Sequence, residues 1–322
     1  MKIRILFVLL FSTLIAAADS ATNSRAAADA AMSKGDYATA IKEYSKALKA
    51  DPGCKICEIN LAGAYVRLGD EKNARKHADK AIASATTPSD IAAAHVAKAE
   101  TILPFAKEDV KKLKEAEAEL RTALQSDSTH AVAHMDLGVM LVKQGREAEG
   151  IEELKQYVTL GRNPENIALV RTWIAHPRAI ITPLAPQFEV PDISGKPIAL
   201  AEMRGKVVVI DFWATWCGPC RNSVGELRDF RAKYSPDEVV LLSVSADEDE
   251  KKWRSFIAEK KMDWLHYWDH DNRIAKLFDV KSFPTYLVID KEGYIVHRIS
   301  GLNERESVGY RLREQLKGMV KN

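Results

Sequence analysis

Two pairs of cysteines are the residues in this chain that are best placed to carry chemistry, because each pair has the spacing C-x-x-C. The first pair is Cys54 and Cys57, the second is Cys217 and Cys220, and the chain holds four cysteines in all. Four cysteines can pair in three ways, and closeness in sequence favours the two local pairings. A zinc site that uses all four is an alternative, but the tryptophan before the second pair and the Gly-Pro within it argue against a zinc ribbon.

The second pair lies in the segment 211–220, where an apolar strand runs into a turn that opens a helix. Cys217 is expected in the first turn of that helix, where free N–H groups and the helix dipole favour negative charge. Thiols in such motifs have pKa values lowered to about 3.5–7.5. We therefore predict that Cys217 is the nucleophile that attacks a substrate disulfide, and that Cys220 resolves the mixed disulfide. Pro219 fixes φ near the helix start, where its missing N–H costs little.

The elements that must hold this segment alternate between strands and helices. Strands are predicted at residues 207–210, 239–244, 286–289 and 295–299. Helices are predicted at residues 221–234, 248–260, 273–278 and 306–319. This alternation indicates an α/β domain around a central sheet, and the nearly unbroken apolar strands indicate that both faces of the sheet are covered. We assign residues 184–322 to this domain.

The order of motifs in this half resembles the thioredoxin superfamily. Residues 216–220 read W-C-G-P-C, and Phe283-Pro284-Thr285 precedes a predicted strand, as the family's cis-proline loop does. Ser300-Gly301 matches the glycine after the family's last strand. An extra strand and helix at residues 239–260, together with the segment before the first strand, is similar to the exported TlpA/ResA-like branch. The resemblance covers nearly all of this domain.

The resemblance implies roles for several residues. It implies a cis peptide bond at Pro284, in a loop that faces Cys217 and pairs with the substrate backbone. It implies that the substrate docks on Trp216, Gly218, Pro219, Phe283, Pro284 and Thr285. Asp211 matches the buried carboxylate that exchanges protons with the resolving thiol, with a pKa raised by desolvation. An inert, hydrogen-bonded Asp211 is the alternative, because the exported branch often has another residue there and the strand at 239–244 lacks the lysine that pairs with this carboxylate in ordinary thioredoxins.

The first half of the chain, residues 22–176, has helix-forming composition and repeats with a period of 34. Gly35 and Gly69 begin matching segments, a later copy runs from Leu137 through Gly145 to Val158, and a weaker copy lies around residues 116–128. One helix pair cannot bury its apolar face alone, so the copies must stack. These spacings resemble the tetratricopeptide repeat (TPR), which implies a peptide or protein ligand on the concave face. An irregular helical bundle without such a groove is the alternative.

Cys54 and Cys57 lie where the first repeat passes into the second. The main prediction for this pair is a structural disulfide that fixes a helix start. Exchange of electrons with Cys217, metal binding and free thiols are the alternatives.

The other polar clusters are interpreted as caps and packing residues. The run Asp247-Glu248-Asp249-Glu250 resembles a metal ligand set, but acidic residues at a helix N-terminus are stabilised by the dipole, so we expect a solvated cap. Residues 269–272 lack the glycine and glutamate of a calcium loop and are expected to form a turn with a helix cap. Ordinary packing or surface roles are expected for two histidine pairs, His130 with His134 and His266 with His270. We predict no metal and no cofactor.

The N-terminal residues predict export. Lys2 and Arg4 precede a largely apolar run from Ile5 to Ile15, which three alanines follow as a cleavage site. The run is too short for a membrane span, which takes about 20 residues. We predict a signal peptide at residues 1–18 and a location outside the cytoplasm, such as the bacterial periplasm, where disulfides persist. Attachment to a membrane is expected only if this segment stays uncleaved.

Composition excludes other classes of protein. The 322 residues, of which 46% are hydrophobic and 29% charged, are typical of a globular chain with about two domains. The 47 basic and 45 acidic residues leave a net charge of +2, which gives no reason to expect a nucleic acid partner.

These observations predict an all-α TPR solenoid followed by an α/β thioredoxin-like domain. We expect an extracytoplasmic thiol-disulfide oxidoreductase whose Cys217/Cys220 dithiol reduces disulfides in partner proteins, with an extracytoplasmic electron donor and a TPR arm that recruits a partner. An adaptor whose thioredoxin fold only docks, and a disulfide-forming oxidant, are the alternatives. A peroxidase of the redoxin type is disfavoured, because it needs a T-x-x-C nucleophile and Thr215 is only two residues from Cys217.

Overall fold

The computed structural model describes residues 19–107, 109–301 and 307–320, and the chain divides into two compact units at Pro177. Each unit has its own hydrophobic core. The predicted signal peptide, residues 1–18, lies outside the described residues. No helix within these described ranges combines the length and the apolar character needed to cross a membrane.

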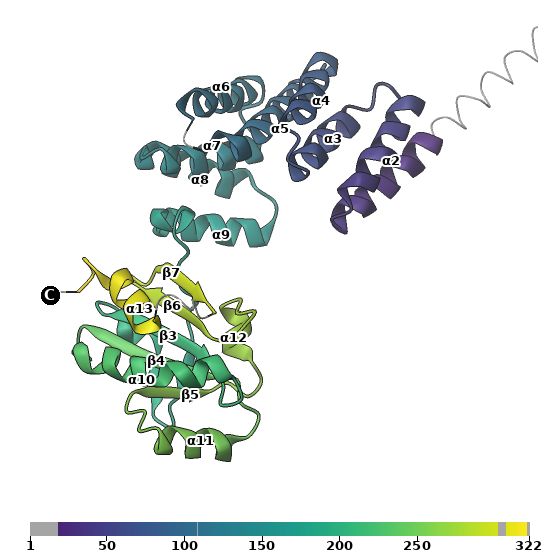
Figure 1. The fold of residues 1–322 in the computed structure, drawn as a ribbon. Coiled ribbons are helices and arrows are strands. Elements are labelled where there is room, and N and C mark those ends of the chain that lie inside the picture. The colour runs from purple at the N-terminus through teal and green to yellow at the C-terminus, as the bar shows by residue number, and fades with distance from the viewer. Residues whose placement is uncertain (1–18, 108, 302–306, 321–322) are drawn as a thin grey trace, which may run out of the picture. The chain divides into compact units, whose positions relative to one another are not determined.

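The first unit is a series of helices joined by short turns (Figure 1). Residues 19–33 are helical. The helices that follow are α2 (Tyr37–Ala50), α3 (Lys55–Arg67), α4 (Glu71–Ser84), α5 (Pro88–Ala106), α6 (Val110–Ser126), α7 (Ala131–Lys143), α8 (Glu147–Leu160) and α9 (Pro164–Ala175). Successive pairs pack together, α3 on α4, α5 on α6 and α7 on α8. The helical repeats predicted from the 34-residue period are therefore present.

A glycine follows three of the helices: the one at residues 19–33, α3 and α7. Gly35, Gly69 and Gly145 have φ values of +75°, +77° and +79°, a region that glycine enters without a Cβ clash. Small residues also let paired helices approach closely. A Cβ built on Gly150 of α8 would lie 2.6 Å from the carbonyl oxygen of Gly138 on α7, so no side chain fits there without a shift.

Partly buried polar pairs join the two helices of a pair. In three pairs a histidine Nδ1 lies 2.5–2.6 Å from a glutamate Oε2 on the facing helix: His77 with Glu58, His95 with Glu119, and His134 with Glu153. The predicted packing role of His134 is confirmed, and His130 is the N-cap of α7, accepting a hydrogen bond from the N–H of Ala133.

The second unit is built on a five-stranded mixed sheet with the order β5-β4-β3-β6-β7 (Figure 1). The strands are β3 (Val207–Trp213), β4 (Val239–Ser245), β5 (Leu265–Trp268), β6 (Thr285–Ile289) and β7 (Ile295–Ser300). β3, β4 and β5 run parallel, while β6 and β7 are antiparallel to their neighbours. The four predicted strands are confirmed within one to three residues.

Helices cover both faces of this sheet, as the apolar strands predicted. They are α10 (Gly218–Lys233), α11 (Glu250–Glu259), α12 (Arg273–Leu277) and α13 (Val308–Leu316). Successive side chains of a strand point to opposite faces. Odd-numbered positions of β3 join the core that includes α10, α11 and α13, and even-numbered positions join the core that includes α12.

Two features near the start of this unit were not predicted. A separate antiparallel hairpin, β1 (Glu189–Pro191) with β2 (Pro197–Ala199), packs in the same core as α12. Its strands have only three residues each, too few for a period-two pattern to be read from the sequence. Two short 3₁₀ helices, η1 (Pro177–Ile180) and η2 (Leu200–Met203), complete the unit.

Candidate active site

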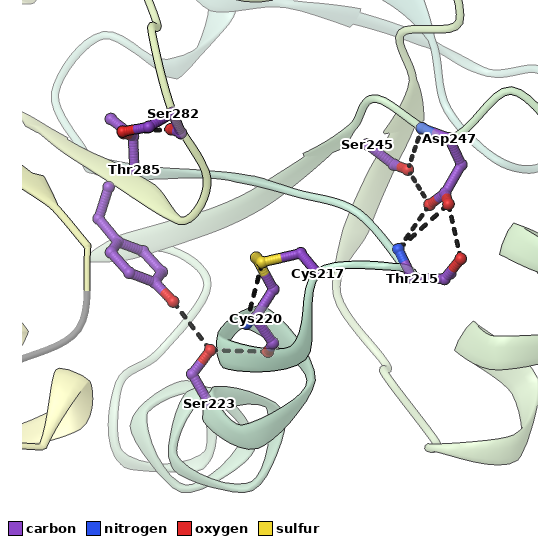
Figure 2. The surroundings of a disulfide bond; sticks show 9 residues. Thr215, Cys217, Cys220, Ser223, Ser245, Asp247, Ser282 and Thr285 are labelled. Carbon is purple, nitrogen blue, oxygen red and sulfur yellow. Dashed lines mark hydrogen bonds between the residues drawn. A yellow bond between two sulfur atoms is a disulfide. The ribbon is translucent and has the colours of Figure 1, made fainter.

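Cys217 and Cys220 form a disulfide at the N-terminus of α10 (Figure 2). Their Cα atoms lie 5.2 Å apart. Cys217 is the N-cap residue, and its Sγ accepts a hydrogen bond from the backbone N–H of Cys220 at 3.2 Å. Cys217 is 6% exposed and Cys220 is 2% exposed. A sulfur that carries negative charge at Cys217 would therefore lie where the free N–H groups and the dipole of α10 stabilise it.

The disulfide lies beyond the carboxyl end of β3, the central strand of the sheet. All seven residues of β3 are buried, and three residues then separate it from the N-cap of α10. The last of these three, Trp216, is 63% exposed, and its ring meets the ring of Phe283 edge to face at 5.9 Å between centroids. Pro219 is also exposed, and Gly218 is half-buried. A large exposed aromatic ring next to this disulfide is suited to contact with another molecule.

The Phe283–Pro284 peptide bond is cis. The carbonyl oxygen of Pro284 accepts a hydrogen bond from the N–H of Gly301 at 2.8 Å, and Phe283 packs against the core cluster that contains both cysteines. The side chain of Thr285 is buried, and its hydroxyl donates to the Ser282 carbonyl oxygen at 2.8 Å (Figure 2). The Thr285 side chain is thus engaged inside the protein, which leaves only its backbone for contact with a substrate.

Asp211 is a buried carboxyl on β3, on the sheet face that α10 covers. It is 2% exposed, and Ser243 of β4 donates a hydrogen bond to its Oδ2 at 2.8 Å. Its Oδ1 has no partner among the described residues. Burial raises the pKa of Asp211 to about 7, and the hydrogen bond from Ser243 acts in the opposite direction. Asp211 makes no hydrogen bond to either cysteine within the described part of the chain.

A hydroxyl pair that the sequence did not reveal lies beside Cys220. Ser223 donates to the carbonyl oxygen of Cys220 at 2.8 Å (Figure 2). The Oγ of Ser223 also lies 2.9 Å from the hydroxyl of Tyr286. Tyr286 is paired with Asp211 across β3 and β6. Burial and the nearby Asp211 raise the pKa of Tyr286, so this phenol stays protonated. Helix α10 is therefore tied to the sheet directly behind Cys220.

The interpretation of Asp247 as part of a solvated helix cap is wrong. Asp247 is 3% exposed, and its carboxylate accepts hydrogen bonds from the backbone N–H of Thr215 at 2.9 Å and from the Thr215 hydroxyl at 2.6 Å (Figure 2). Ser245 also donates to it, at 2.6 Å. The rest of the acidic run behaves as expected, since Asp249 is exposed and caps α11 by accepting from the N–H of Lys252. Asp247 and Asp249 differ in burial, and a single sequence cannot reveal that difference.

The remaining candidates have structural roles. Asp269 is buried and caps α12 by accepting from the backbone N–H groups of Ile274 and Ala275, as predicted for that turn. His266 is buried on β5, and burial lowers its pKa to about 4. Among the described residues no group of three or more His, Cys, Asp or Glu could hold a metal ion.

Cys54 and Cys57 form a second disulfide, at the start of α3. Cys54 is the N-cap residue, and Cys57 is fully buried in a core cluster with Leu61 and several alanines. The two C-x-x-C pairs are thus separate local disulfides, each in its own unit.

A C-x-x-C disulfide at a helix N-terminus, on a mixed sheet and next to a cis-proline loop, defines a thioredoxin-like protein. Residues 181–298 match the AhpC/TSA family, and residues 25–91 and 108–167 match the tetratricopeptide repeat. Over 127 residues the chain is 33% identical to the thiol-disulfide oxidoreductase ResA of a Bacillus cereus strain, and the match covers 39% of this chain and 73% of that protein. The chain belongs to the family of thiol-disulfide oxidoreductases that includes ResA, and it carries TPR repeats ahead of its thioredoxin-like unit.

Two further comparisons concern the same unit. Over 137 residues the chain is 31% identical to ResA of Bacillus anthracis, and the match covers 42% of this chain and 75% of that protein. The thioredoxin domain of a thiol-disulfide oxidoreductase from Bacteroides vulgatus is a similar solved structure, with 26% identity and a TM-score of 0.37, and the match covers 41% of this chain and 94% of that one.

Proposed function

We propose that this oxidoreductase reduces disulfides in partner proteins outside the cytoplasm, with Cys217 as nucleophile and Cys220 as resolving thiol, and that its helical unit recruits a partner. The observation that carries the proposal is the Cys217–Cys220 disulfide at the N-terminus of α10, beside the exposed ring of Trp216.

The first step is attack by the Cys217 thiolate on one sulfur of the substrate disulfide. A bond forms between Cys217 Sγ and that sulfur, and the other substrate sulfur leaves as a thiolate that takes up a proton. The N-cap position supports this step, because the N–H of Cys220 and the dipole of α10 favour the charged form of Cys217.

The second step is attack by Cys220 on the Sγ of Cys217. The Cys217–Cys220 bond forms, and the second substrate sulfur leaves as a thiolate. The two electrons gained by the substrate come from the dithiol, so the enzyme ends as the disulfide present in the structure. A dithiol protein that acts as extracytoplasmic electron donor must then reduce it.

Asp211 is proposed to accept the proton of Cys220 in this step and to return it later. Its pKa, raised by burial to about 7, lies near neutral pH, where one carboxyl can both accept and donate. Its Oδ1 is free of partners among the described residues and faces the side of the sheet that α10 covers, so a buried water can link it to Cys220.

The substrate is proposed to dock on Trp216, Gly218, Pro219, Phe283, Pro284 and the backbone of Thr285. Exposure supports Trp216 and Pro219 as the leading contacts, with the half-buried Phe283 ring beside them. The Gly-Pro between the cysteines favours a reductant over an oxidant, by resemblance to the thioredoxins. A redox titration tests this direction, since potentials in the superfamily run from about −270 mV for thioredoxin to about −120 mV for a strong oxidant.

Recruitment by the helical unit is supported by two hollows of about 350 Å³ each, which share Leu103, Pro104 and Asp136. Their walls come mainly from α3, α5 and α7, the first helices of successive pairs. Asp136 Oδ2 is buried there without a hydrogen-bond partner among the described residues. Ligand sites in proteins are typically of this size or larger, and they offer polar groups that remain to be paired.

The proposal is tested by trapping mixed disulfides. A Cys220→Ala variant cannot resolve the intermediate, so it should remain joined to substrate proteins through Cys217, which mass spectrometry then names. Cys57→Ala is the matched control, because it also removes the second cysteine of a C-x-x-C pair at a helix start. No cysteine-linked partner from cells in which the wild type is active would contradict the enzyme's proposed role. If Cys217→Ser left the cellular effect intact, the adaptor alternative would be correct.

A further inference from the structure

Thr215 stands two residues before Cys217, and both of its hydrogen-bond donors are directed into the protein. Its backbone N–H and its hydroxyl donate to the carboxylate of Asp247, at 2.9 Å and 2.6 Å (Figure 2). The backbone ladder between β3 and β4 ends just before this point, with the Ala246 N–H donating to the Trp213 carbonyl oxygen at 3.0 Å. Beyond this point the Thr215 N–H donates to the side-chain carboxylate of Asp247, which follows β4, and not to a backbone carbonyl oxygen.

Asp247 is itself held in place from two directions. Ser245 donates to its Oδ2 at 2.6 Å and accepts from its backbone N–H at 3.1 Å. The indole N–H of Trp268, at the end of β5, donates to its carbonyl oxygen. Trp268 in turn stacks on Trp253 of α11, with 6.4 Å between ring centroids. The Asp247 carboxylate is therefore held in one position at the end of the sheet, unlike a mobile charge on the surface.

We propose that Asp247 is a positioning residue for the dithiol: by holding Thr215, it keeps the Cys217 sulfur at the N-cap of α10. The inference rests on the proposed role of Cys217 as the nucleophile. We call the hydrogen bonds of the Asp247 carboxylate to Thr215 and Ser245 the Asp247 clamp. With the clamp in place, Thr215, the middle residue of the three-residue segment between β3 and the N-cap of α10, is fixed by its hydrogen bonds, and the end of the segment is fixed by the helix.

The same contacts orient the Trp216 ring, the proposed substrate contact. Thr215 precedes Trp216 directly, and its donors are bound inside the protein while the Trp216 ring is 63% exposed next to Phe283. A loop without the clamp would let the sulfur of Cys217 move away from the N–H of Cys220, which donates to it at 3.2 Å. The thiolate would then lose helix stabilisation, and its pKa would rise towards the ordinary value for a thiol, about 8.5.

A purely electrostatic role for Asp247 predicts that the pKa of Cys217 shifts in the opposite direction when the carboxylate is removed. A carboxylate close to Cys217 disfavours the thiolate, so removal of its charge would lower the pKa of that thiol. The two roles are therefore separated by the direction in which one measured pKa moves.

The test uses the full reduced chain and follows the rate of Cys217 alkylation by iodoacetamide as a function of pH. Asp247→Asn should raise the thiol pKa by about one unit and slow alkylation at pH 7 by about tenfold. Thr215→Val, which keeps the charge and loses the hydroxyl bond, should shift the pKa in the same direction by less, and Thr215→Ser should restore the wild-type value. Asp249→Asn is the matched control from the same acidic run, and it should leave the pKa unchanged.

A lower or unchanged thiol pKa in Asp247→Asn would overturn the inference. If that variant does not fold, the pair Thr215→Val and Thr215→Ser decides, because equal pKa values in the two would also overturn it. Mass spectrometry of the alkylated chain keeps this result apart from the proposed function: a label on Cys220 would contradict the assignment of the nucleophile, whereas a label on Cys217 leaves that assignment standing.

Discussion

The two C-x-x-C disulfides of this chain occupy nearly the same local position in two different folds. Cys54 and Cys217 are both N-cap residues of an α-helix, and the Cα–Cα distances across the two bonds are 5.3 Å and 5.2 Å. In each pair the second cysteine is buried in a hydrophobic core. Position at a helix N-terminus, which is the usual argument for a reactive cysteine, therefore does not distinguish the pairs.

What differs is the surroundings. Cys217 Sγ accepts a hydrogen bond from its own helix, whereas Cys54 makes no side-chain capping bond. The Cys217 pair has an exposed tryptophan, a cis-proline loop and a buried acid around it, while the Cys54 pair packs among alanines and Leu61. Together with the proposed roles of the two pairs, the comparison predicts that a reactive disulfide needs a docking surface and a nearby proton acceptor in addition to a helix dipole. Each feature can be removed in turn.

Loss of the buried acid is expected to have the largest effect. Asp211→Asn keeps the shape of the side chain but cannot take up the proton of Cys220, so resolution of the mixed disulfide should slow by about 100-fold near neutral pH. Alkylation of Cys217 should stay at the wild-type rate, which serves as the internal control. Single-turnover kinetics with a disulfide peptide measures both steps. Equal resolution rates in the variant and the wild type would show that Asp211 is only a core residue.

The same substitution should change how stability depends on pH. The folded, oxidised enzyme keeps a proton on Asp211 up to about pH 7, whereas the unfolded chain releases it near the ordinary value of 3.8. The wild type should therefore lose stability as the pH rises between about 4 and 7, by at most about 4 kcal/mol, and Asp211→Asn should lack this loss. Five of the six tryptophans lie beyond residue 178, so tryptophan fluorescence during urea unfolding reports mainly on this unit.

Removal of the exposed Trp216 ring should have an intermediate effect. Trp216→Ala takes away a side chain that is 63% exposed and contacts Phe283, so little stability is lost but a protein substrate loses an aromatic contact. The KM for a protein disulfide should rise by about tenfold, while turnover of a small aromatic disulfide stays within about twofold. A fall in both activities would instead mean that Trp216 supports the reacting sulfur itself.

The sequence predicted the parts of this molecule that depend on local pattern. Such patterns extend over only one or two neighbouring elements, so residue spacing alone is enough to predict them. They are the 34-residue period, the alternation of strands and helices, and the W-C-G-P-C segment. The contacts around the dithiol are different, because they join residues that are distant in the chain. Ser223 meets Tyr286 across 63 positions, and Ser243 meets Asp211 across 32.

Asp247 and Asp249 show why such contacts escape a single sequence. Both belong to one acidic run before α11, and helix propensity and dipole arguments apply to them equally. The turn after β4 places Asp247 inside, against Thr215, and leaves Asp249 at the surface as the cap of α11. The register of β4 against β3, which pairs Trp213 with Ser245, brings the residues that follow each strand together, and that register depends on the whole sheet.

The smallest effect is expected at the disulfide of the helical unit. Replacement of both Cys54 and Cys57 by serine removes a bond between residues three positions apart, and closing so short a loop contributes about 2 kcal/mol to stability through the unfolded chain. Far-ultraviolet circular dichroism during urea unfolding should show that loss in the helical unit, with fluorescence of the other unit unchanged. Disulfide reductase turnover should stay within about twofold of the wild type, because the Cys217 pair and its surroundings are intact. A large loss of turnover would mean instead that electrons pass between the two pairs, and that a C-x-x-C at a helix start can be redox-active without its own docking ring and acid.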